Sequence, residues 1–503
     1  MRSTSRTPGG VIVLAAALAA ACGTRPVDPL AGAPVVAHRE PRIRALQHDL
    51  ATLFASPVLQ GGAAAVAVQS LDRGDTLFRY NAARLLIPAS TLKLVTVAAA
   101  VELLGWDYRF TTTITATGPI EDGVLRGDLV VTGDGDPTLS RRYEGHESVF
   151  AGWADRLAAA GLRRVEGRLV GDDRAWAGAP WGAGWSWEDL RYAYGAPVDA
   201  LQAGDGTVPL LIVPGLAPGR AASVTLSGSR ALSIEPDVTT AENGSAPSIE
   251  FHRVPGGPTL RVSGQIAADA LPLVLYPSVT DPTEQYLDSL RLVLEEGGIV
   301  IERGIADLDE SDAPPVPLAP PLLEHRSPPL SALAGVTLRD SHNLHAESLL
   351  RAIARTTDRA ATADTGLRVV SRLLREWGVP ERTVLAADGS GLSRRNHVSA
   401  DALLAVLRRM AGDERHRDRW MAALPIGGSD GTLAKRFETG PSRGRVRAKT
   451  GSLSYVRALA GYVRTADDET LAFVILLNDA AAPRGALEDV IDRAVDRLAV
   501  FRR

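Results

Sequence analysis

The sequence predicts an α+β fold in which an antiparallel sheet carries helices on both faces and a large β-rich region is inserted between its two halves. A helix, two strands and a second helix follow one another at residues 43–104. Three strands and a closing helix end the chain at residues 446–498. Between them, residues 106–279 change to short β-branched segments rich in turn residues. This order of elements favours one layered sheet built from both ends of the chain.

The first part of the chain has clear periodicity. Ile43 to Leu53 has the apolar spacing of a helix, and Ala64 to Leu71 predicts a strand. Asp72 to Asp75 is rich in turn residues and predicts a hairpin to a second strand, Thr76 to Tyr80. We expect the next helix to begin near Ser90 and to run through an apolar segment as far as Leu104.

The inserted region is predicted at residues 106–280, as one or two modules. Phe110 to Thr117 and Val124 to Thr132 are β-branched and alternate, which is typical of strands. Gly133 to Pro137 reads GDGDP, and we interpret it as a tight turn because it lacks the spaced acidic ligands of a calcium loop. Residues 41–105 and 281–503 would then form the main domain.

Helical periodicity returns after the insertion. The expected helices are Thr283 to Gly297, Leu330 to Thr356, Thr365 to Trp377, Ala400 to Met410 and Arg484 to Leu498. The expected strands are Val446 to Ala448, Ala458 to Val463 and Thr470 to Leu477.

The N-terminus predicts export. Arg2 and Arg6 precede an apolar run, residues 11–21, which is short for a membrane span and has the flanks of a signal peptide. Cys22, the only cysteine, follows directly, so we predict a signal peptide at residues 1–21 and lipidation of Cys22. The alternative is an ordinary residue inside a signal removed by a different peptidase. Residues 22–40 are rich in Pro and Ala and predict a tether to the envelope.

Composition excludes several classes of protein. A chain of 503 residues with 45% hydrophobic residues can bury a large core, and its net charge of −4 argues against a nucleic-acid partner. Away from the N-terminus, no stretch is long and apolar enough to predict a transmembrane helix.

Ser90 and Lys93 suggest nucleophilic chemistry. Residues three apart share one face of a helix, and a lysine whose pKa is lowered by burial can take the proton of a serine hydroxyl. The alternative is a helix N-cap followed by a solvated lysine. The chain has only three lysines, Lys93, Lys435 and Lys449, and arginine cannot replace a lysine that must lose its proton. The placement of the few lysines therefore favours a catalytic role.

Two more motifs follow in a fixed order. Ser341-His342-Asn343 lies in a helical region, and Lys449-Thr450-Gly451 follows a strand. Each alone has a structural explanation, as a helix cap or as the turn at a strand end. The series S-x-x-K, S-x-N and K-T-G is the set found in serine enzymes that act on or are acylated by β-lactams.

The wider sequence resembles one family. DGSGLSR at 388–394, SDGTL at 429–433, RAKTGSL at 447–453 and GWSWEDLRYAYGAPV at 184–198 are similar to the D-alanyl-D-alanine carboxypeptidase/endopeptidase family, the class C low-molecular-mass penicillin-binding proteins. The resemblance extends from Pro41 to the C-terminus and implies a β-lactamase/transpeptidase-like domain. His342 departs from the Asp or Asn that is commoner there.

The resemblance also implies roles in an acyl-enzyme reaction. Ser90 would attack the carbonyl of the penultimate D-alanine, Lys93 would take its proton, and Ser341 would return a proton to the leaving amine with help from Lys449. Asn343 would bind the substrate peptide, and the Lys449-Thr450-Gly451-Ser452 segment would hold the terminal carboxylate. The backbone N–H groups of Ser90 and Ser452 would form the oxyanion hole.

Two residues are candidates for substrate selection. The resemblance implies that the insertion and the DGSGLSR loop help recognise the free amino group of a diamino-acid side chain. By position, Asp172 and Arg394 are the candidates, and the alternative for both is a surface ion pair.

We expect no cofactor and no metal, because the nine histidines are scattered without a carboxylate-rich ligand pattern. The partners implied by the resemblance are peptidoglycan stem peptides, with β-lactams as covalent inhibitors, on the periplasmic side of a bacterial envelope. The membrane would be reached only through a lipid on Cys22. Two other functions stay open: a β-lactamase-like hydrolase and a peptidoglycan-binding scaffold with a dormant site.

Overall fold

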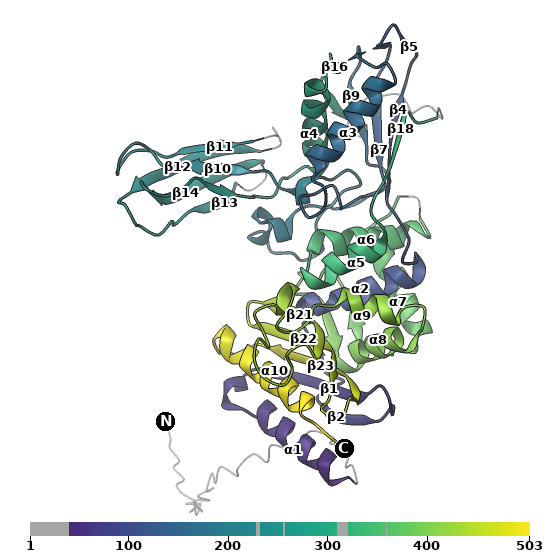
Figure 1. Cartoon of the computed structure of the whole chain (residues 1–503), viewed down its shortest axis with the longest axis vertical. Coiled ribbons are helices and arrows are strands. Elements are labelled where there is room, and N and C mark those ends of the chain that lie inside the picture. Colours follow the sequence, from purple (N-terminus) through teal and green to yellow (C-terminus); the bar gives the residue numbers. More distant parts are fainter. Residues whose placement is uncertain (1–39, 228–231, 255–256, 309–319, 359) are drawn as a thin grey trace, which may run out of the picture.

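The structure is a computed structural model, and it describes residues 40–503 except 228–231, 255–256, 309–319 and 359. The predicted signal peptide, Cys22 and almost all of the predicted tether lie outside the described residues. Figure 1 shows a sheet-and-helix domain with a second layered module above it and a narrow arm of strands projecting sideways.

A five-stranded antiparallel sheet organises the lower domain. Its order is β2-β1-β23-β22-β21, in which β1 (Ala63–Ser70) and β2 (Thr76–Tyr80) come from the N-terminal part of the chain. The C-terminal part supplies β21 (Val446–Leu453), β22 (Val456–Arg464) and β23 (Thr470–Asn478). The predicted sheet, built from both ends of the chain, is confirmed.

Helices cover both faces of this sheet, as predicted. Alternate side chains of a strand point to opposite faces, so Val66 joins one apolar core and Ala65 and Ala67 join another. The first core is closed by α1 (Pro41–Phe54) and α10 (Arg484–Ala499). The second is closed by six helices: α2 (Lys93–Leu103), α5 (Leu330–Arg339), α6 (Asn343–Arg355), α7 (Ala363–Glu376), α8 (Ala400–Gly412) and α9 (Arg417–Ala423).

The first inserted module is a five-stranded sheet of order β17-β9-β7-β4-β18. Its strands are β4 (Thr111–Ala116), β7 (Leu129–Gly133), β9 (Leu169–Asp172), β17 (Ile305–Asp307) and β18 (Leu323–Arg326). Two helices, α3 (His146–Ala159) and α4 (Pro282–Glu296), share one apolar core with this sheet. A smaller sheet at its far end pairs β5 (Ile120–Glu121), β6 (Val124–Leu125), β8 (Arg164–Val165) and β16 (Val300–Ile301).

The module corrects the predicted boundary at residue 280. The apolar side chains of α4 pack in one core with those of α3 and the inserted sheet. Strand β17 pairs with β9, and β18 pairs with β4. The described elements α4, β16, β17 and β18 therefore belong to the insertion, and the chain returns to the lower domain before α5.

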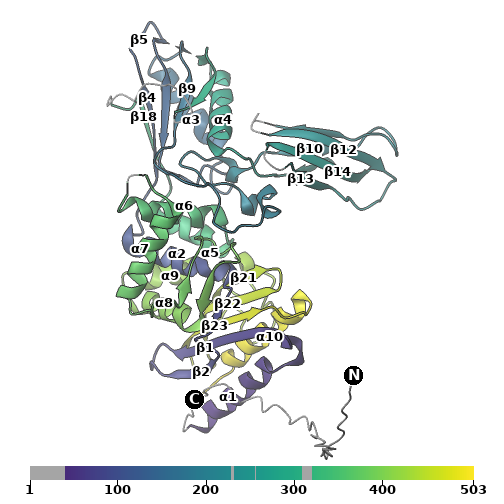
Figure 2. The ribbon, with the colours of Figure 1, turned by 180° about the vertical axis from the view of Figure 1, so that it is seen from behind.

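The second inserted module is the arm, seen from both sides in Figures 1 and 2. One of its three-stranded sheets is β11-β10-β15, from β10 (Leu210–Val213), β11 (Ser223–Leu226) and β15 (Leu273–Leu275). The other is β12-β14-β13, from β12 (Ser233–Ala241), β13 (Glu250–Arg253) and β14 (Thr259–Ala267). A small apolar core lies between the two sheets.

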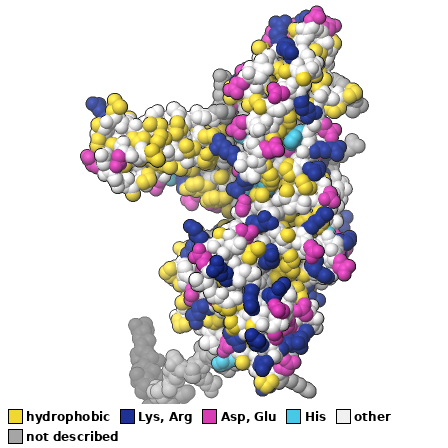
Figure 3. All heavy atoms as spheres, in the orientation of Figure 1, with side chains coloured by type: hydrophobic (Ala, Val, Ile, Leu, Met, Phe, Trp, Pro, Cys, Tyr) yellow, Lys and Arg dark blue, Asp and Glu magenta, His cyan; other side chains and the backbone are white. Residues whose placement is uncertain are grey.

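Acidic and basic side chains are interspersed on the face of the molecule in Figure 3. This mixture is the opposite of the continuous basic surface that binds nucleic acids. Among the described residues, none of the helices has the length and hydropathy that a membrane span requires.

Candidate active site

Ser90 lies where the chain turns into the central helix. A 3₁₀ turn, Ala89–Leu92, runs directly into α2, which begins at Lys93. Lys93 Nζ lies 3.0 Å from Ser90 Oγ, so the serine and the lysine are in contact as predicted. Lys93 is 0% exposed, and the serine caps no helix, which excludes the alternative of an N-cap followed by a solvated lysine.

Two further oxygens hold the amine of Lys93. Nζ donates to Asn343 Oδ1 over 2.6 Å and to the backbone oxygen of Ser390 over 2.6 Å. Burial lowers the pKa of Lys93 to about 7, although the nearby Asp388 and Glu347 carboxylates act in the opposite direction. An amine with this pKa is largely neutral in slightly alkaline solution, as a general base must be.

Ser341 sits in a break between two helices. We expected one helical region over 330–356, but α5 ends at Arg339 and α6 begins at Asn343. Ser341 has a φ of 63°, in the left-handed region that interrupts a helix. The turn brings Ser341 to the cleft beside Ser90, while Asn343 Nδ2 donates to the backbone oxygen of Tyr194 over 2.7 Å.

The third motif lies on β21, at the edge of the sheet that faces the nucleophile. Lys449 is 0% exposed, its Nζ donates to the oxygen of Thr450 over 2.9 Å, and burial together with the charge of Lys93 holds its pKa well below the ordinary value. A side chain at Gly451 would place its Cβ 2.6 Å from the oxygen of Pro88. Glycine therefore lets the strand pass closely against the turn that carries Ser90.

The loop after residue 388 supports this arrangement from behind. Glu347 Oε1, on α6, accepts hydrogen bonds from the N–H groups of Gly389 and Ser390 over 3.0 and 2.8 Å. Asp388 accepts from Gly391 N–H over 2.8 Å and from three further donors. Sequence reasoning missed Glu347 and Asp388, because their role is to fix a loop whose backbone oxygen then binds Lys93.

The catalytic groups line a cleft. One cavity of about 570 Å³ and an adjoining one of about 350 Å³ both reach Ser90, Ser341 and Ser452. The larger cavity is also lined by Asn343 and Arg394, and the smaller by Thr450 and Gly451. The structure thus brings together at one cleft, or directly behind it, the predicted residues Ser90, Lys93, Ser341, Asn343, Lys449, Thr450, Gly451 and Ser452.

Of the two candidates for substrate selection, Arg394 lies at the cleft and Asp172 does not. Arg394 lines the larger cavity and donates to the backbone oxygen of Ser454 over 2.6 and 3.1 Å. Asp172 does not reach the cleft, because it ends β9 in the inserted module and pairs with Arg174 over 2.8 Å. Two carboxylates of the insertion do line the larger cavity, Glu188 and Asp189. Both belong to the GWSWEDL segment, whose sequence resembles the carboxypeptidase family.

Two clusters among the described residues could offer three ligand atoms to a metal: Asp205 with His342 and His345, and Glu102 with Asp413 and His416. In the first, His342 Nε2 lies 3.3 Å from Asp205 Oδ1, and Arg142 already provides a cation 3.6 Å from Asp205. In the second, Arg409 and Arg415 pair with both carboxylates. These guanidinium groups balance the carboxylates, so we assign no metal to either cluster.

Comparison with known proteins identifies close relatives. Residues 46–498 match the sequence model of the D-Ala-D-Ala carboxypeptidase 3 (S13) family. The chain is 33% identical to a D-alanyl-D-alanine carboxypeptidase of Actinomadura sp. strain R39, over 94% of this chain and 89% of that protein. It is 28% identical to the D-alanyl-D-alanine carboxypeptidase DacB of Haemophilus influenzae, over 86% of this chain and 89% of that protein.

Solved structures of a related protein have the same fold as this chain. The crystal structure of penicillin binding protein 4 from Haemophilus influenzae superposes with a TM-score of 0.80 at 26% identity, over 90% of this chain and all of that one. A complex of the same protein with a β-lactam superposes with a TM-score of 0.73 at 25% identity and the same coverage.

Proposed function

Because this chain belongs to the D-Ala-D-Ala carboxypeptidase 3 (S13) family, it is a serine carboxypeptidase that acts on peptidoglycan, and we propose which of its residues perform each step. The observation that carries the proposal is the contact between Ser90 Oγ and the buried amine of Lys93. Burial lowers the pKa of that amine to about 7, which makes it a base at the pH of the envelope.

In the first step, Ser90 Oγ attacks the carbonyl carbon of the penultimate D-alanine while its proton passes to Lys93 Nζ. The tetrahedral intermediate then breaks its C–N bond, and the terminal D-alanine leaves as an amine. Ser341 gives that nitrogen a proton and recovers one from Lys93 or Lys449, so that protons balance over the step. The product is an ester between the peptide and Ser90.

The terminal carboxylate of the substrate belongs at β21. Thr450 and Ser452 line the cleft and present hydroxyl groups. Lys449 lies behind them, and the negative charge of a bound carboxylate would favour its ammonium form, which burial and the charge of Lys93 otherwise disfavour. Backbone N–H groups of Ser90 and Ser452 would stabilise the oxyanion, a contribution of roughly 3 kcal/mol for each donor. Asn343 would hold the substrate's peptide backbone through its side-chain amide.

Water completes the reaction by attacking the ester, and a β-lactam would form the same ester but leave slowly. A β-lactamase needs a group that activates water against this ester. Glu347 is the carboxylate that α6 carries, and it is 0% exposed and bound to the loop N–H groups. Its position favours a structural role and therefore the peptidase over a β-lactamase.

Recognition of a diamino-acid side chain would fall to the larger cavity. Arg394 remains a candidate there, and we replace Asp172 with Asp189, which lies on the cavity wall with Glu188. A carboxylate at this wall would pair with the free amino group of the side chain. The hydroxyl of Tyr194 donates to Asp189 Oδ1 over 2.9 Å and so orients the carboxylate.

The chain acts in the cell envelope, where its substrate lies. We propose in addition that residues 1–21 direct export, that Cys22 carries a lipid, and that cleavage of cross-linked stem peptides accompanies carboxypeptidase activity.

The function is tested by release of D-alanine from a synthetic pentapeptide ending in D-Ala-D-Ala. The purified protein should release the terminal residue, and Ser90→Ala should lose this activity while Ser223→Ala, an exposed serine of the arm, should retain it. Release that is unchanged in Ser90→Ala would overturn the assignment of the nucleophile.

A further inference from the structure

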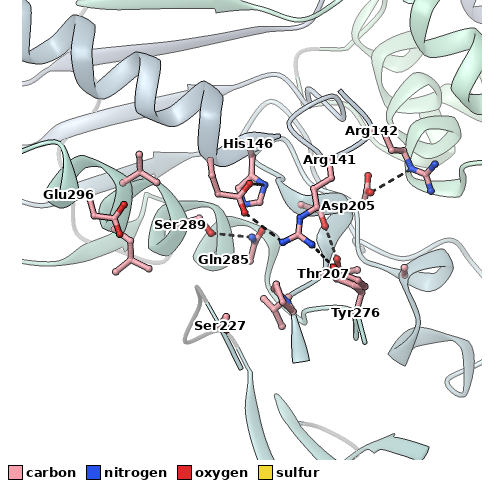
Figure 4. A pocket seen from close by; sticks show the side chains of 17 residues that line it. Arg141, Arg142, His146, Asp205, Thr207, Ser227, Tyr276, Gln285, Ser289 and Glu296 are labelled. Carbon is pink, nitrogen blue, oxygen red and sulfur yellow. Dashed lines mark hydrogen bonds and ion pairs between the residues drawn. The ribbon is translucent and has the colours of Figure 1, made fainter. Parts of the chain in front are cut away.

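Figure 4 shows a cavity that lies outside the catalytic cleft, between the inserted module and the arm. Two guanidinium groups and three carboxylates line it, and they belong to Arg141, Arg142, Glu147, Asp205 and Glu296. Because charges of both signs line this cavity, it selects no single class of ligand.

The smaller cavity of the catalytic cleft, of about 350 Å³, has an excess of guanidinium groups instead. Its charged lining residues are Arg436, Arg457, Arg484 and Glu488. The last two belong to α10, which packs against β22, the strand that carries Arg457. The cavity therefore extends from the nucleophile, Ser90, to the beginning of α10.

Arg457 lies beside the third motif of the site. In the antiparallel pair of β21 and β22 it is directly opposite Ser452, so the two side chains project from one face of the sheet, about 5 Å apart at Cβ. The Arg457 side chain is 12% exposed, and its Nη1 donates to the backbone oxygens of Leu453 and Val456 over 2.7 and 2.6 Å. Its Nη2 donates no hydrogen bond to any described residue.

Two guanidinium groups share one carboxylate at this end of the cavity. Glu488 Oε1 lies 3.5 Å from Arg457 Nε and accepts a hydrogen bond from Arg484 Nε over 2.8 Å. Burial lowers the pKa of Arg457, the charges of Arg484 and Arg436 lower it as well, and Glu488 acts in the opposite direction. A second carboxylate between these guanidinium groups would relieve their repulsion.

The other carboxylates on this face of α10 do not supply that charge. Asp492 is paired with Arg436, whose Nε donates to Asp492 Oδ1 over 3.2 Å. Asp496 lies two turns beyond Glu488, about 12 Å along the helix axis, and it does not line the cavity. Salt screens most of the interaction between surface charges at that distance. The end of the cavity near Arg457 therefore keeps one positive charge that no neighbouring carboxylate balances.

This excess charge lies on the side of the cleft that receives the leaving group. Thr450, which is proposed to hold the terminal carboxylate, lines the smaller cavity, and Ser341, the proposed proton donor to the leaving amine, lines both cavities. Arg394 and Asp189, on the acyl side, line the larger cavity. A leaving D-alanine has only a methyl group beyond its carboxylate, and a methyl group cannot pair with a guanidinium. The charge fits a leaving group with a second carboxylate.

We propose that Arg457 binds a second carboxylate, carried on the side chain of the residue that leaves. The subsite rests on the proposed function, because it requires that an amine be released on this side of Ser90. The substrate class is a D-alanyl peptide whose leaving amino acid or peptide is acidic beyond the carboxylate held by Thr450 and Ser452. Arg457 would thus be a residue that determines specificity for the leaving group.

The test uses three Nα,Nε-diacetyl-L-lysyl-D-alanyl peptides that end in D-alanine, D-glutamate or D-glutamine. D-Glutamate and D-glutamine have the same shape but differ in charge, so the ratio of their kcat/KM values isolates the second carboxylate. The wild type should prefer D-glutamate by about tenfold, and Arg457→Gln should bring the ratio to about one. Arg493→Gln removes an exposed arginine of α10 that lines neither cavity of the cleft, and it should keep the wild-type ratio.

Arg457→Lys separates charge from structural support. Lysine keeps the positive charge but cannot reproduce the fork of bonds to Leu453 and Val456, so this variant should retain a preference for D-glutamate of about threefold or more. A wild-type ratio of one, with the D-alanine peptide hydrolysed, would overturn the subsite and leave the proposed function standing. A ratio that Arg457→Gln does not change, or an equal rise in KM for all three peptides, would also overturn it. Failure to hydrolyse any of the peptides would overturn the proposed function itself.

Discussion

Lys93 Nζ donates a hydrogen bond to Asn343 Oδ1 over 2.6 Å, so the first and second motifs of the site are in direct contact. The same asparagine donates to Tyr194 of the inserted module over 2.7 Å. Asn343 therefore connects the base, the helix break that carries Ser341, and the wall of the larger cavity. This contact explains how an insertion of more than two hundred residues can be tied to the position of one amine.

Replacement of Lys93 by arginine tests the need for a neutral base. Arginine keeps the positive charge but cannot give up its proton, so Lys93→Arg should lower the rate of penicillin acylation by roughly 10²–10⁴-fold. Lys435→Arg changes an exposed lysine in the same way and should keep the wild-type rate. Fully active Lys93→Arg would show that Lys93 is not the base.

The pKa of Lys93 predicts the pH dependence of acylation. Burial lowers that pKa to about 7, and only the neutral amine can accept the proton of Ser90. The acylation rate should therefore rise with pH, by about tenfold per unit below pH 7, and level off above it. Stopped-flow rates with a chromogenic β-lactam measure this profile. A rate that falls as pH rises through 7 would contradict a lysine base.

Gly391 permits the close approach between the supporting loop and the nucleophile turn. Its φ is 84°, and an added Cβ would lie 2.0 Å from the backbone oxygen of Ala89. Gly391→Ala should thus displace the Ser90 turn and reduce acylation by about a hundredfold or more. Gly412→Ala, at the end of α8 with no atom within 4 Å of the new Cβ, is the matched control. Equal rates for both variants would exclude this role of the loop.

Asp189 should select substrates that carry a free amino group. Asp189→Asn should raise KM by about tenfold for a peptide whose diamino-acid side chain is free. The same peptide acetylated on that amine lacks the charge and should show no change, which makes it the internal control. An equal rise in KM for both peptides would indicate that Asp189 stabilises the cleft but does not bind the amino group.

Cys22 is predicted to carry the anchor. Cys22→Ser should move the protein from the membrane fraction to the soluble fraction of expressing cells and should abolish incorporation of labelled palmitate. An unchanged distribution between the fractions would show that Cys22 carries no lipid anchor.

The sequence was most informative where a local run of residues predicts one element, or where the chemistry requires one residue type. The apolar run in Ala64 to Leu71, followed by a turn, predicted β1, and the scarcity of lysine drew attention to Lys93 and Lys449. The break at Ser341 was not predicted, because no glycine or proline marks its left-handed φ and the apolar spacing continues across it. Helix α3 was missed too, since it lies among segments whose turn residues favoured strands.

Contacts between residues far apart in the sequence explain two other wrong predictions, the domain boundary at 280 and the choice of Asp172. Strands β16 and β17 have two and three residues, too few to show a period, and they join the insertion by pairing with β8 and β9 more than a hundred residues earlier. The boundary at 280 was wrong for that reason. Asp172 was chosen by position along the chain, whereas the distance to the cleft depends on how the inserted sheet is oriented.

The central claim is an acyl-enzyme on Ser90, and its most direct test is a time course of penicillin labelling followed by intact mass and peptide mapping. We expect one stable adduct on the peptide that contains Ser90, and no adduct in Ser90→Ala. A short-lived adduct with rapid turnover of penicillin would favour a β-lactamase, and an adduct on another residue, or none, would contradict the proposed nucleophile.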